Sequence, residues 1–244
     1  MNIEELKEVF KAHVEKFNMN EKPITKKFYH SYRVMDICEK LAYSINLNEE
    51  DTYIAMVIGL LHDYARFEQW TNYKTFSDLN SIDHADLAVK KLFDENEIDK
   101  FKIKKEYYEV IYNAIKYHNK LDYPENLDDR NKLFCKIIRD ADKIDILYLL
   151  GLEEEKVKED ELEISEKVKK DFYCNNLRNR ADLKNINDNV VLKIALLYDL
   201  NFKYSYKYIK DNKLMYKMFE TLKYKDKFKP YFEHIYKYIE ERSK

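Results

Sequence analysis

Glycine and proline are so scarce in this chain that a helical fold is strongly favoured. Only 2 Gly and 3 Pro occur among its 244 residues. Sheets and barrels need frequent tight turns, in which these residue types predominate, whereas helices can be joined by short polar loops. Hydrophobic residues make up 45% of the chain and charged residues 37%, which is typical of a globular protein and not of a disordered one. The sequence therefore predicts an all-α fold.

The spacing of apolar residues predicts where the helices lie. Apolar residues recur every three or four positions over 3–17, 25–45, 50–65, about 103–117 and about 128–150. Ser81 is expected to cap a further helix, after an aromatic-rich loop at 67–80. A charge-alternating helix is expected over 153–170, then an apolar segment at 190–202 and two or three Tyr- and Lys-rich helices. We expect a single domain over 1–244, with its core at about 25–150 and a C-terminal helical extension at about 151–244.

Several classes of function are disfavoured by composition. The net charge of −2 gives no global basic field for nucleic acid. The longest apolar run, residues 54–61, is too short to span a bilayer, and the N-terminus lacks the layout of a signal peptide. Cys38, Cys135 and Cys174 are odd in number and form no CxxC pair, as expected for buried thiols in a reducing compartment. We therefore expect a cytoplasmic protein that binds neither membrane nor nucleic acid.

Five ionisable side chains stand where the helical period predicts apolar ones. Each lies four residues from an apolar residue on the same helix face, and they are His30, His62, His84, His118 and Asp142. Any one histidine alone is more often a core residue with a single hydrogen bond, and that interpretation is kept for the two remaining ones. Their joint occurrence in a chain with only 6 His indicates metal binding, because imidazole and carboxylate form a common ligand set.

The strongest local signal is the adjacent pair His62-Asp63 in GLLHDYAR, at the end of the most apolar helix. Together with FYHSYRV before it and RDADKID after it, this pair resembles the HD superfamily of metal-dependent phosphohydrolases over about residues 25–150. The resemblance implies an HD-type helical bundle with additional C-terminal helices. It also implies that His30, His62, Asp63 and Asp142 bind one metal ion. Asp142 is preferred to Asp140 because the family's last aspartate normally follows a small residue.

Two-metal branches of the superfamily add two histidines between the HD pair and the last aspartate. These branches include the HD-GYP cyclic dinucleotide phosphodiesterases and the diadenosine tetraphosphate hydrolases. His84 in SIDHADLAV and His118 in AIKYHNK stand at those places, and Asp63 would then bridge two ions. The GYP signature is absent, which disfavours cyclic dinucleotide activity. Two ions are therefore expected in preference to one, drawn from Fe, Mn, Co or Ni, with Mg as an alternative.

The resemblance implies an enzyme that hydrolyses a phosphomonoester or phosphodiester, in a nucleotide or another small phosphorylated compound, through a metal-bound hydroxide. Arg66, three residues past the HD aspartate, is expected to contribute to catalysis by contacting phosphate, although a surface role is equally open. Lys143, Arg33 and Lys120 are further candidate phosphate contacts, each of which could equally be a surface charge. Asp145 or Glu68 could orient the water or protonate the leaving group.

Two other classes of protein share these features. One is a non-catalytic HD-domain regulator that binds a metal or a nucleotide. The other is a helical scaffold whose histidines are core residues. Filled ligand positions favour the enzyme, while the substrate, the metal and the oligomeric state are left open by the sequence.

Overall fold

Every regular element that the structure describes is helical. The computed structural model describes residues 2–152, 157–177 and 180–244, and no strand occurs within these ranges. The predicted all-α fold is therefore confirmed. The chain divides into two compact units, residues 1–141 and 142–244, and the division falls inside one helix. The assignment of a single domain over 1–244 stays a prediction, and each unit is described by itself.

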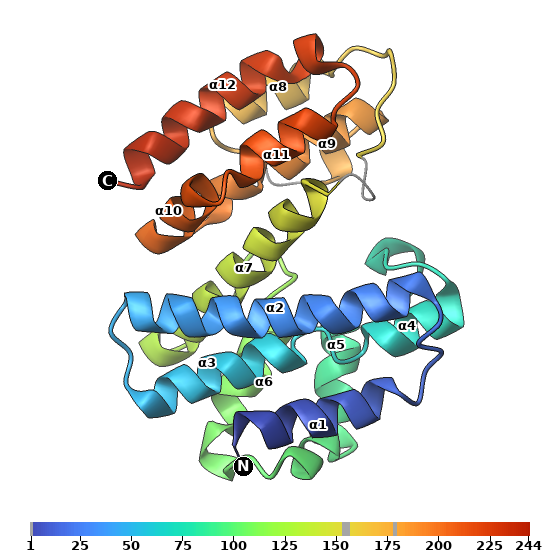
Figure 1. Ribbon diagram of the computed structural model, residues 1–244, viewed down its shortest axis with the longest axis vertical. Coiled ribbons are helices and arrows are strands. Elements are labelled where there is room, and N and C mark those ends of the chain that lie inside the picture. Colours follow the sequence, from blue (N-terminus) through green and yellow to red (C-terminus); the bar gives the residue numbers. More distant parts are fainter. Residues whose placement is uncertain (1, 153–156, 178–179) are drawn as a thin grey trace. The chain divides into compact units, whose positions relative to one another are not determined.

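The first unit holds six helices and the beginning of a seventh, drawn from blue to green in Figure 1. They are α1 (Ile3–Val14), α2 (Lys22–Ser44), α3 (Glu49–Leu61), α4 (Arg66–Tyr73), α5 (His84–Val89), α6 (Tyr108–Tyr117) and α7 (Asp129–Leu150). Short 3₁₀ turns at Asp78–Asn80, Glu97–Phe101 and Lys105–Tyr107 and a π-helical turn at Lys90–Asp94 complete this unit.

Helices α2 and α3 lie side by side, as Figure 1 shows, and form the main packing contact of the first unit. From Thr52 to the end of α3 every residue but Tyr53 is buried, in agreement with the apolar character of this segment. Gly59 allows the close approach, because a Cβ there would lie 2.8 Å from the Cα of Met35 and 3.0 Å from the Sγ of Cys38. Asn48 begins α3, since its side chain accepts a hydrogen bond from the Asp51 amide.

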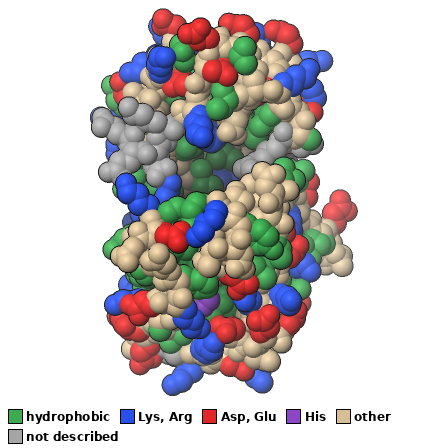
Figure 2. All heavy atoms as spheres, turned by 90° about the vertical axis from the view of Figure 1, so that its right-hand side faces the viewer, with side chains coloured by type: hydrophobic (Ala, Val, Ile, Leu, Met, Phe, Trp, Pro, Cys, Tyr) green, Lys and Arg blue, Asp and Glu red, His purple; other side chains and the backbone are tan. Residues whose placement is uncertain are grey.

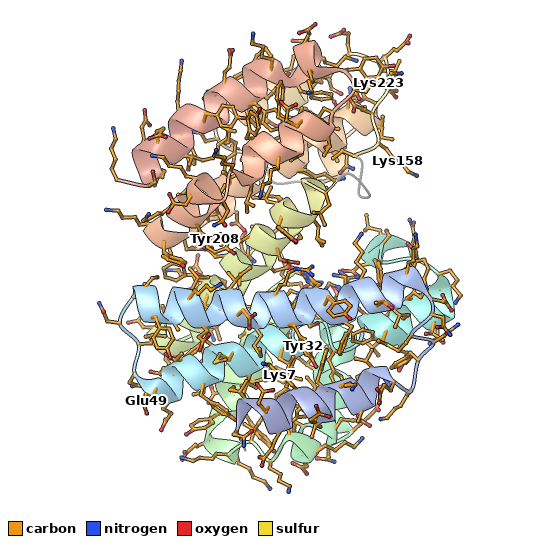
Figure 3. The ribbon with its side chains drawn as sticks, in the orientation of Figure 1. Lys7, Tyr32, Glu49, Lys158, Tyr208 and Lys223 are labelled. Carbon is orange, nitrogen blue, oxygen red and sulfur yellow. The ribbon has the colours of Figure 1, made fainter. Side chains whose placement is uncertain are left out.

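Helix α1 packs against the same two helices. Its first turn is closed by a capping box in which the side chains of Asn2 and Glu5 bond each other's backbone amides. The Tyr32 hydroxyl on α2 donates to the Lys7 carbonyl at 3.3 Å, and Figure 3 shows these two residues together where the helices meet. Phe10 adds an apolar contact to this packing, because its side chain is fully buried and its ring stacks 6.2 Å from that of Phe28.

The second unit continues α7 and adds α8 (Glu166–Tyr173), α9 (Ile186–Ile194), α10 (Lys203–Asp211), α11 (Leu214–Thr221) and α12 (Lys225–Arg242). Short 3₁₀ turns span Arg180–Asp182 and Ala195–Asp199. The apolar segment at 190–202 forms α9 and the turn after it, and α9 packs against α8 and α12. The last three helices confirm the expected Tyr- and Lys-rich helices of the C-terminal region.

Several expectations about individual helices, one helix cap and one cysteine are wrong. The loop expected at 67–80 begins with helix α4, which buries Phe67 and Gln69 on one side. Helix α5 is capped by Asp83 and not by Ser81, because the Asp83 carboxylate accepts from two backbone amides of the first turn. In the segment 153–170, residues 153–156 lie outside the described residues, and helical structure begins only at Glu166. Cys174 is exposed, whereas the other two cysteines are buried.

The surface carries charges of both signs. On the face drawn in Figure 2, basic and acidic side chains are interspersed and histidine is visible over a small area only. Within the described residues, no helix combines the length and the apolar character needed to cross a membrane.

Candidate metal centre

Four of the predicted ligands lie at helix positions that direct them into the interior of the first unit. His30 lies within α2, His62 follows the last residue of α3, His118 follows the last residue of α6, and His84 is the first residue of α5. All four side chains, with Asp63 beside them, are at most 5% exposed. A buried cluster of this kind is costly unless its polar atoms find partners or a cation.

The carboxylate of Asp63 divides the histidines into two pairs. Its Oδ2 atom lies 3.4 Å from Nε2 of His30 and 3.5 Å from Nε2 of His62. Its Oδ1 atom lies 3.3 Å from Nε2 of His84 and 3.8 Å from Nε2 of His118. Within each pair the two Nε2 atoms are also close, at 3.2 Å for His30 and His62 and 3.0 Å for His84 and His118. Each carboxylate oxygen therefore faces its own pair of imidazole nitrogens.

Hydrogen bonds on the far side of the rings fix the tautomers of three histidines. The Nδ1 atom of His62 donates to the carbonyl of Gly59 at 2.8 Å, and that of His118 donates to the carbonyl of Ile115 at 2.7 Å. For His84, Nδ1 faces the Asp78 carboxylate at 2.8 Å. Because carbonyl and carboxylate oxygens only accept, Nδ1 carries the proton in each ring and Nε2 presents a lone pair.

This arrangement fits a divalent transition metal. The lone pairs of His84 and His118 face each other at 3.0 Å, which is repulsive unless a cation or a proton lies between them. Ligands about 2.1 Å from an ion lie about 3.0 Å apart at a right angle and about 3.4 Å apart at the tetrahedral angle. Most of the nitrogen and oxygen spacings around Asp63 fall in or next to this range. Burial also lowers the pKa of His84 to about 4, so that its imidazole is neutral at pH 7, as a ligand must be.

Two cations hold Asp63 in its charged form. Lys27 on α2 donates to Oδ2 at 2.6 Å, and Nε of Arg66 on α4 donates to Oδ1 at 3.3 Å. Burial alone would raise the pKa of Asp63, but the positive charges of Lys27 and Arg66 help to outweigh it and keep the pKa well below its usual value. Both cations also lie against the ring of Phe76, at 5.6 and 5.7 Å from its centroid. The centre therefore has a positive rim on one side.

A second carboxylate, Asp78, organises the region around His84. It accepts hydrogen bonds from Arg66 Nη1 at 3.0 Å, Gln69 Nε2 at 2.9 Å and Asn119 Nδ2 at 3.1 Å, in addition to His84. Burial opposes its ionisation, but hydrogen bonds from His84 and Gln69 and the charge of Arg66 hold the pKa of Asp78 below its usual value. Asp78 is therefore a charged acceptor surrounded by donors from three segments.

The segment after His118 is held by a buried arginine. The Arg139 guanidinium on α7 donates to the carbonyls of Tyr117, Lys120 and Leu121, at 3.3, 2.5 and 3.0 Å. These carbonyls lie at and just after the end of α6, where helical partners run out. Lys120, considered from sequence as a phosphate contact, is paired with Asp83 at 2.5 Å instead.

Three further predicted residues lie on α2, on α4 and in the second unit. Arg33 is half-buried on α2, one turn after His30. Glu68 pairs with Lys91 at 2.5 Å. Lys143 pairs with Asp199 at 2.7 Å within the second unit.

The last aspartate of the motif lies on α7 at the division between the units. Asp140 is buried at the end of the first unit, and Asp142 is the first residue of the second. The helical repeat puts Asp142 on the same side of α7 as Ile138, which is fully buried. Asp145 is buried as well. The roles of these three aspartates stay predictions.

Sequence reasoning missed Lys27 and Asp78. Lys27 had a usable signal, because it precedes His30 by three residues and therefore shares its helix face. Asp78 had none, since it lies in an irregular segment where no periodicity relates it to His84.

Comparison with known families agrees with this geometry. The family model described as the HD domain matches residues 28–147, a range that includes Asp63 and all four buried histidines around it. No curated protein and no solved structure matches the chain. The order of the histidines, the HD pair and the all-helical fold agree with this match, and residues 28–147 belong to the HD-domain family.

Proposed function

We propose that this protein is a metal-dependent phosphohydrolase that acts on a small phosphorylated compound. The observation that carries the proposal is the position of Asp63, whose two oxygens each face a separate pair of histidines. A carboxylate so placed suits a bridge between two divalent ions. We assign His30, His62 and Asp142 to one ion and His84 and His118 to the other. Imidazole and carboxylate ligands favour Fe, Mn, Co or Ni, with Mg as an alternative.

When bound, such ions would supply a water of lowered pKa and would offset the charge of a phosphoryl group. The chain's own residues supply the rest. Lys27 and Arg66 balance the negative charges of Asp63 and Asp78, so that bound ions would give the site the net positive charge that favours an anionic substrate. Arg66 is oriented in advance, because its Nη1 donates to Gln69, to the Phe76 carbonyl and to Asp78. A guanidinium held in this way suits phosphate contact.

A nucleotide is the substrate class we favour. Phe76 lies beside the two cations, and its ring is 5.1 Å from that of Trp70. An aromatic pair next to a phosphate-binding arginine could stack on a base. Arg33 and Lys143 are further proposed phosphate contacts, and Asp145 is the proposed group that orients water or protonates the leaving group. We also keep the cytoplasm as the proposed compartment, because the odd number of cysteines and the lack of a CxxC pair suit a reducing environment.

The rival proposal is a regulatory HD-domain protein that binds a metal or a nucleotide without turnover. The cations Lys27 and Arg66 disfavour a regulator that holds metal alone, because such a site has no need of two cations beside a ligand carboxylate, and they leave a nucleotide-binding regulator as the rival. The two proposals differ in turnover and agree in metal content, so both quantities have to be measured on the same preparations.

The test compares metal content and hydrolysis in four proteins purified without chelators: the wild type, Asp63→Ala, His118→Ala and the control His234→Ala. His234 lies in the second unit and contacts Asn175 at 3.4 Å. Metal is measured by elemental analysis, and hydrolysis by phosphate release from nucleotides and from aryl phosphate mono- and diesters with added Mn²⁺ or Fe²⁺. We expect about two ions per wild-type and control chain and about one in His118→Ala. Asp63→Ala should lose both the metal and the activity.

Four results would each overturn part of the proposed function. Full metal content and activity in Asp63→Ala would remove the ligand assignment. One ion per chain in both the wild type and His118→Ala would reduce the centre to one ion, and two ions in both would remove His118 from the ligands. Bound metal without hydrolysis of any substrate would favour the regulator over the enzyme.

A further inference from the structure

The ligand histidines differ in how their outer nitrogens are bound. His62 and His118 follow the last residues of helices α3 and α6, where backbone carbonyls lack helical partners. Each therefore donates its Nδ1 proton to the carbonyl three residues before it, at 2.8 and 2.7 Å. These tautomers are set locally by the end of the histidine's own helix.

His84 has no such local acceptor. It is the first residue of α5, and the free backbone groups at the start of a helix are amides, which donate. The acceptor for its Nδ1 proton is instead a side chain, the Asp78 carboxylate, whose oxygens lie at 2.8 and 2.9 Å. The orientation of His84 therefore depends on a residue outside its helix.

We propose that Asp78 is a positioning residue that keeps His84 protonated on Nδ1 and thereby presents Nε2 to the metal. The inference rests on the proposed function in so far as His84 binds an ion. Metal-binding histidines commonly donate their second N–H to a carboxylate, which fixes the ring and increases its basicity. Nε2 of His84 lies 3.3 Å from Asp63 and 3.0 Å from His118, in the direction that this tautomer requires.

The neighbours of Asp78 explain why a carboxylate is needed and an amide would fail. Its Oδ1 accepts from Arg66 and from Gln69, which is fully buried, and its Oδ2 accepts from Asn119. All of these partners donate, so both oxygens must be acceptors. In Asp78→Asn one oxygen becomes an NH₂ group and faces at least one donor. The amide can relieve this conflict by donating to His84, which would move the ring proton to Nε2 and block the metal-binding atom.

The first measurement uses the protein without metal, in which the tautomer can be read directly. Nitrogen-15 NMR of the histidine rings, with the His84 signals assigned from His84→Gln, separates Nδ1–H from Nε2–H imidazole. We expect His84 of the wild type and of the control Asp86→Asn to be protonated on Nδ1. Asp86 lies on the same helix and pairs with Lys120 at 3.1 Å. In Asp78→Asn and Asp78→Ala we expect a substantial Nε2–H population.

The second measurement is calorimetric titration with Mn²⁺. Loss of a carboxylate partner of this kind weakens metal affinity about 10- to 100-fold. We expect that loss for one ion in both Asp78 variants, an unchanged affinity for the ion at His30 and His62, and no change in Asp86→Asn. A merely structural role would weaken both ions together and leave the tautomer unchanged.

The two measurements separate the failure of this inference from that of the proposed function. An Nε2–H tautomer for His84 in the wild type would overturn the inference without any variant. Retention of Nδ1–H together with both affinities in the Asp78 variants would overturn it as well. A wild type that binds no metal would refute the proposed function, and the tautomer spectra would still show whether Asp78 positions His84.

Discussion

His13 should make the free energy of unfolding of the first unit depend on pH between the folded and the unfolded pKa of this histidine. It is buried on α1, its Nε2 lies 3.2 Å from the Tyr64 carbonyl, and its ring stacks on that of Tyr64 at 3.7 Å. Its Nδ1 atom is buried without a hydrogen-bond partner. Burial, and less strongly the charges of Lys16 and Lys100, lower the pKa of His13 to about 4, while the Tyr64 carbonyl and Glu97 oppose the shift. The folded state therefore holds this imidazole neutral.

The magnitude follows from the difference between the folded and unfolded pKa values. The unfolded chain protonates His13 near the ordinary histidine pKa of 6.5, whereas the folded chain does so only at about 4. As the pH falls below the unfolded value, the unfolded state takes up a proton that the folded state resists. The free energy of unfolding then decreases by about 1.4 kcal/mol per pH unit down to about pH 4. Between about pH 7.5 and about pH 5 the loss from His13 amounts to about 2 kcal/mol.

The assay compares urea unfolding of the wild type with that of His13→Phe and His13→Gln at these two pH values. The single tryptophan, Trp70, lies on α4 and reports the first unit selectively. His84, whose pKa is also lowered to about 4, contributes equally to all three proteins. Carboxylates with lowered pKa, such as Glu97 at about 2, lose their contribution only at lower pH. The difference in pH dependence between wild type and variants therefore isolates His13.

We expect the two variants to lose about 2 kcal/mol less than the wild type between these pH values, whatever their stability at neutral pH. The comparison uses the change with pH and not the absolute stability, so a packing defect in either variant does not obscure it. An equal loss in the wild type and both variants would refute the reasoning, because His13 would then protonate as readily in the folded protein as in the unfolded chain.

Two further predictions concern the packing that supports the metal centre. Gly59→Ala should destabilise the first unit by about 1–3 kcal/mol, because the added methyl group forces α3 away from α2 at Met35. The melting temperature, followed by Trp70 fluorescence, should therefore fall. An unchanged or higher melting temperature would contradict this prediction. Arg139→Met should lower the free energy of unfolding of the first unit by about 2–4 kcal/mol, since three carbonyls between 117 and 121 lose a charged donor. Hydrogen exchange should quicken in the segment around His118, and unaltered protection there would show that the guanidinium does not hold it.

Local sequence patterns determined the helices and most of the metal ligands. The three- and four-residue period identifies which side of a helix is buried, so a histidine on that side is recognisable without knowledge of its neighbours. His30, His62, His84 and His118 were found in this way, and all four are buried around Asp63. The same reasoning failed for α4, because its buried side is short and contains the polar residue Gln69.

Only the tertiary structure showed that the four histidines form two pairs around Asp63 and which side chains hold these ligands in place. The separation of the histidines into two pairs depends on which oxygen of Asp63 each approaches, and no sequence spacing encodes that choice. Asp78 reaches His84 from an irregular segment, and Lys27 reaches Asp63 from a different helix. Periodicity relates residues on one helix, whereas contacts between separate segments are fixed by the packing of the whole unit, and that packing determined the surroundings of the centre.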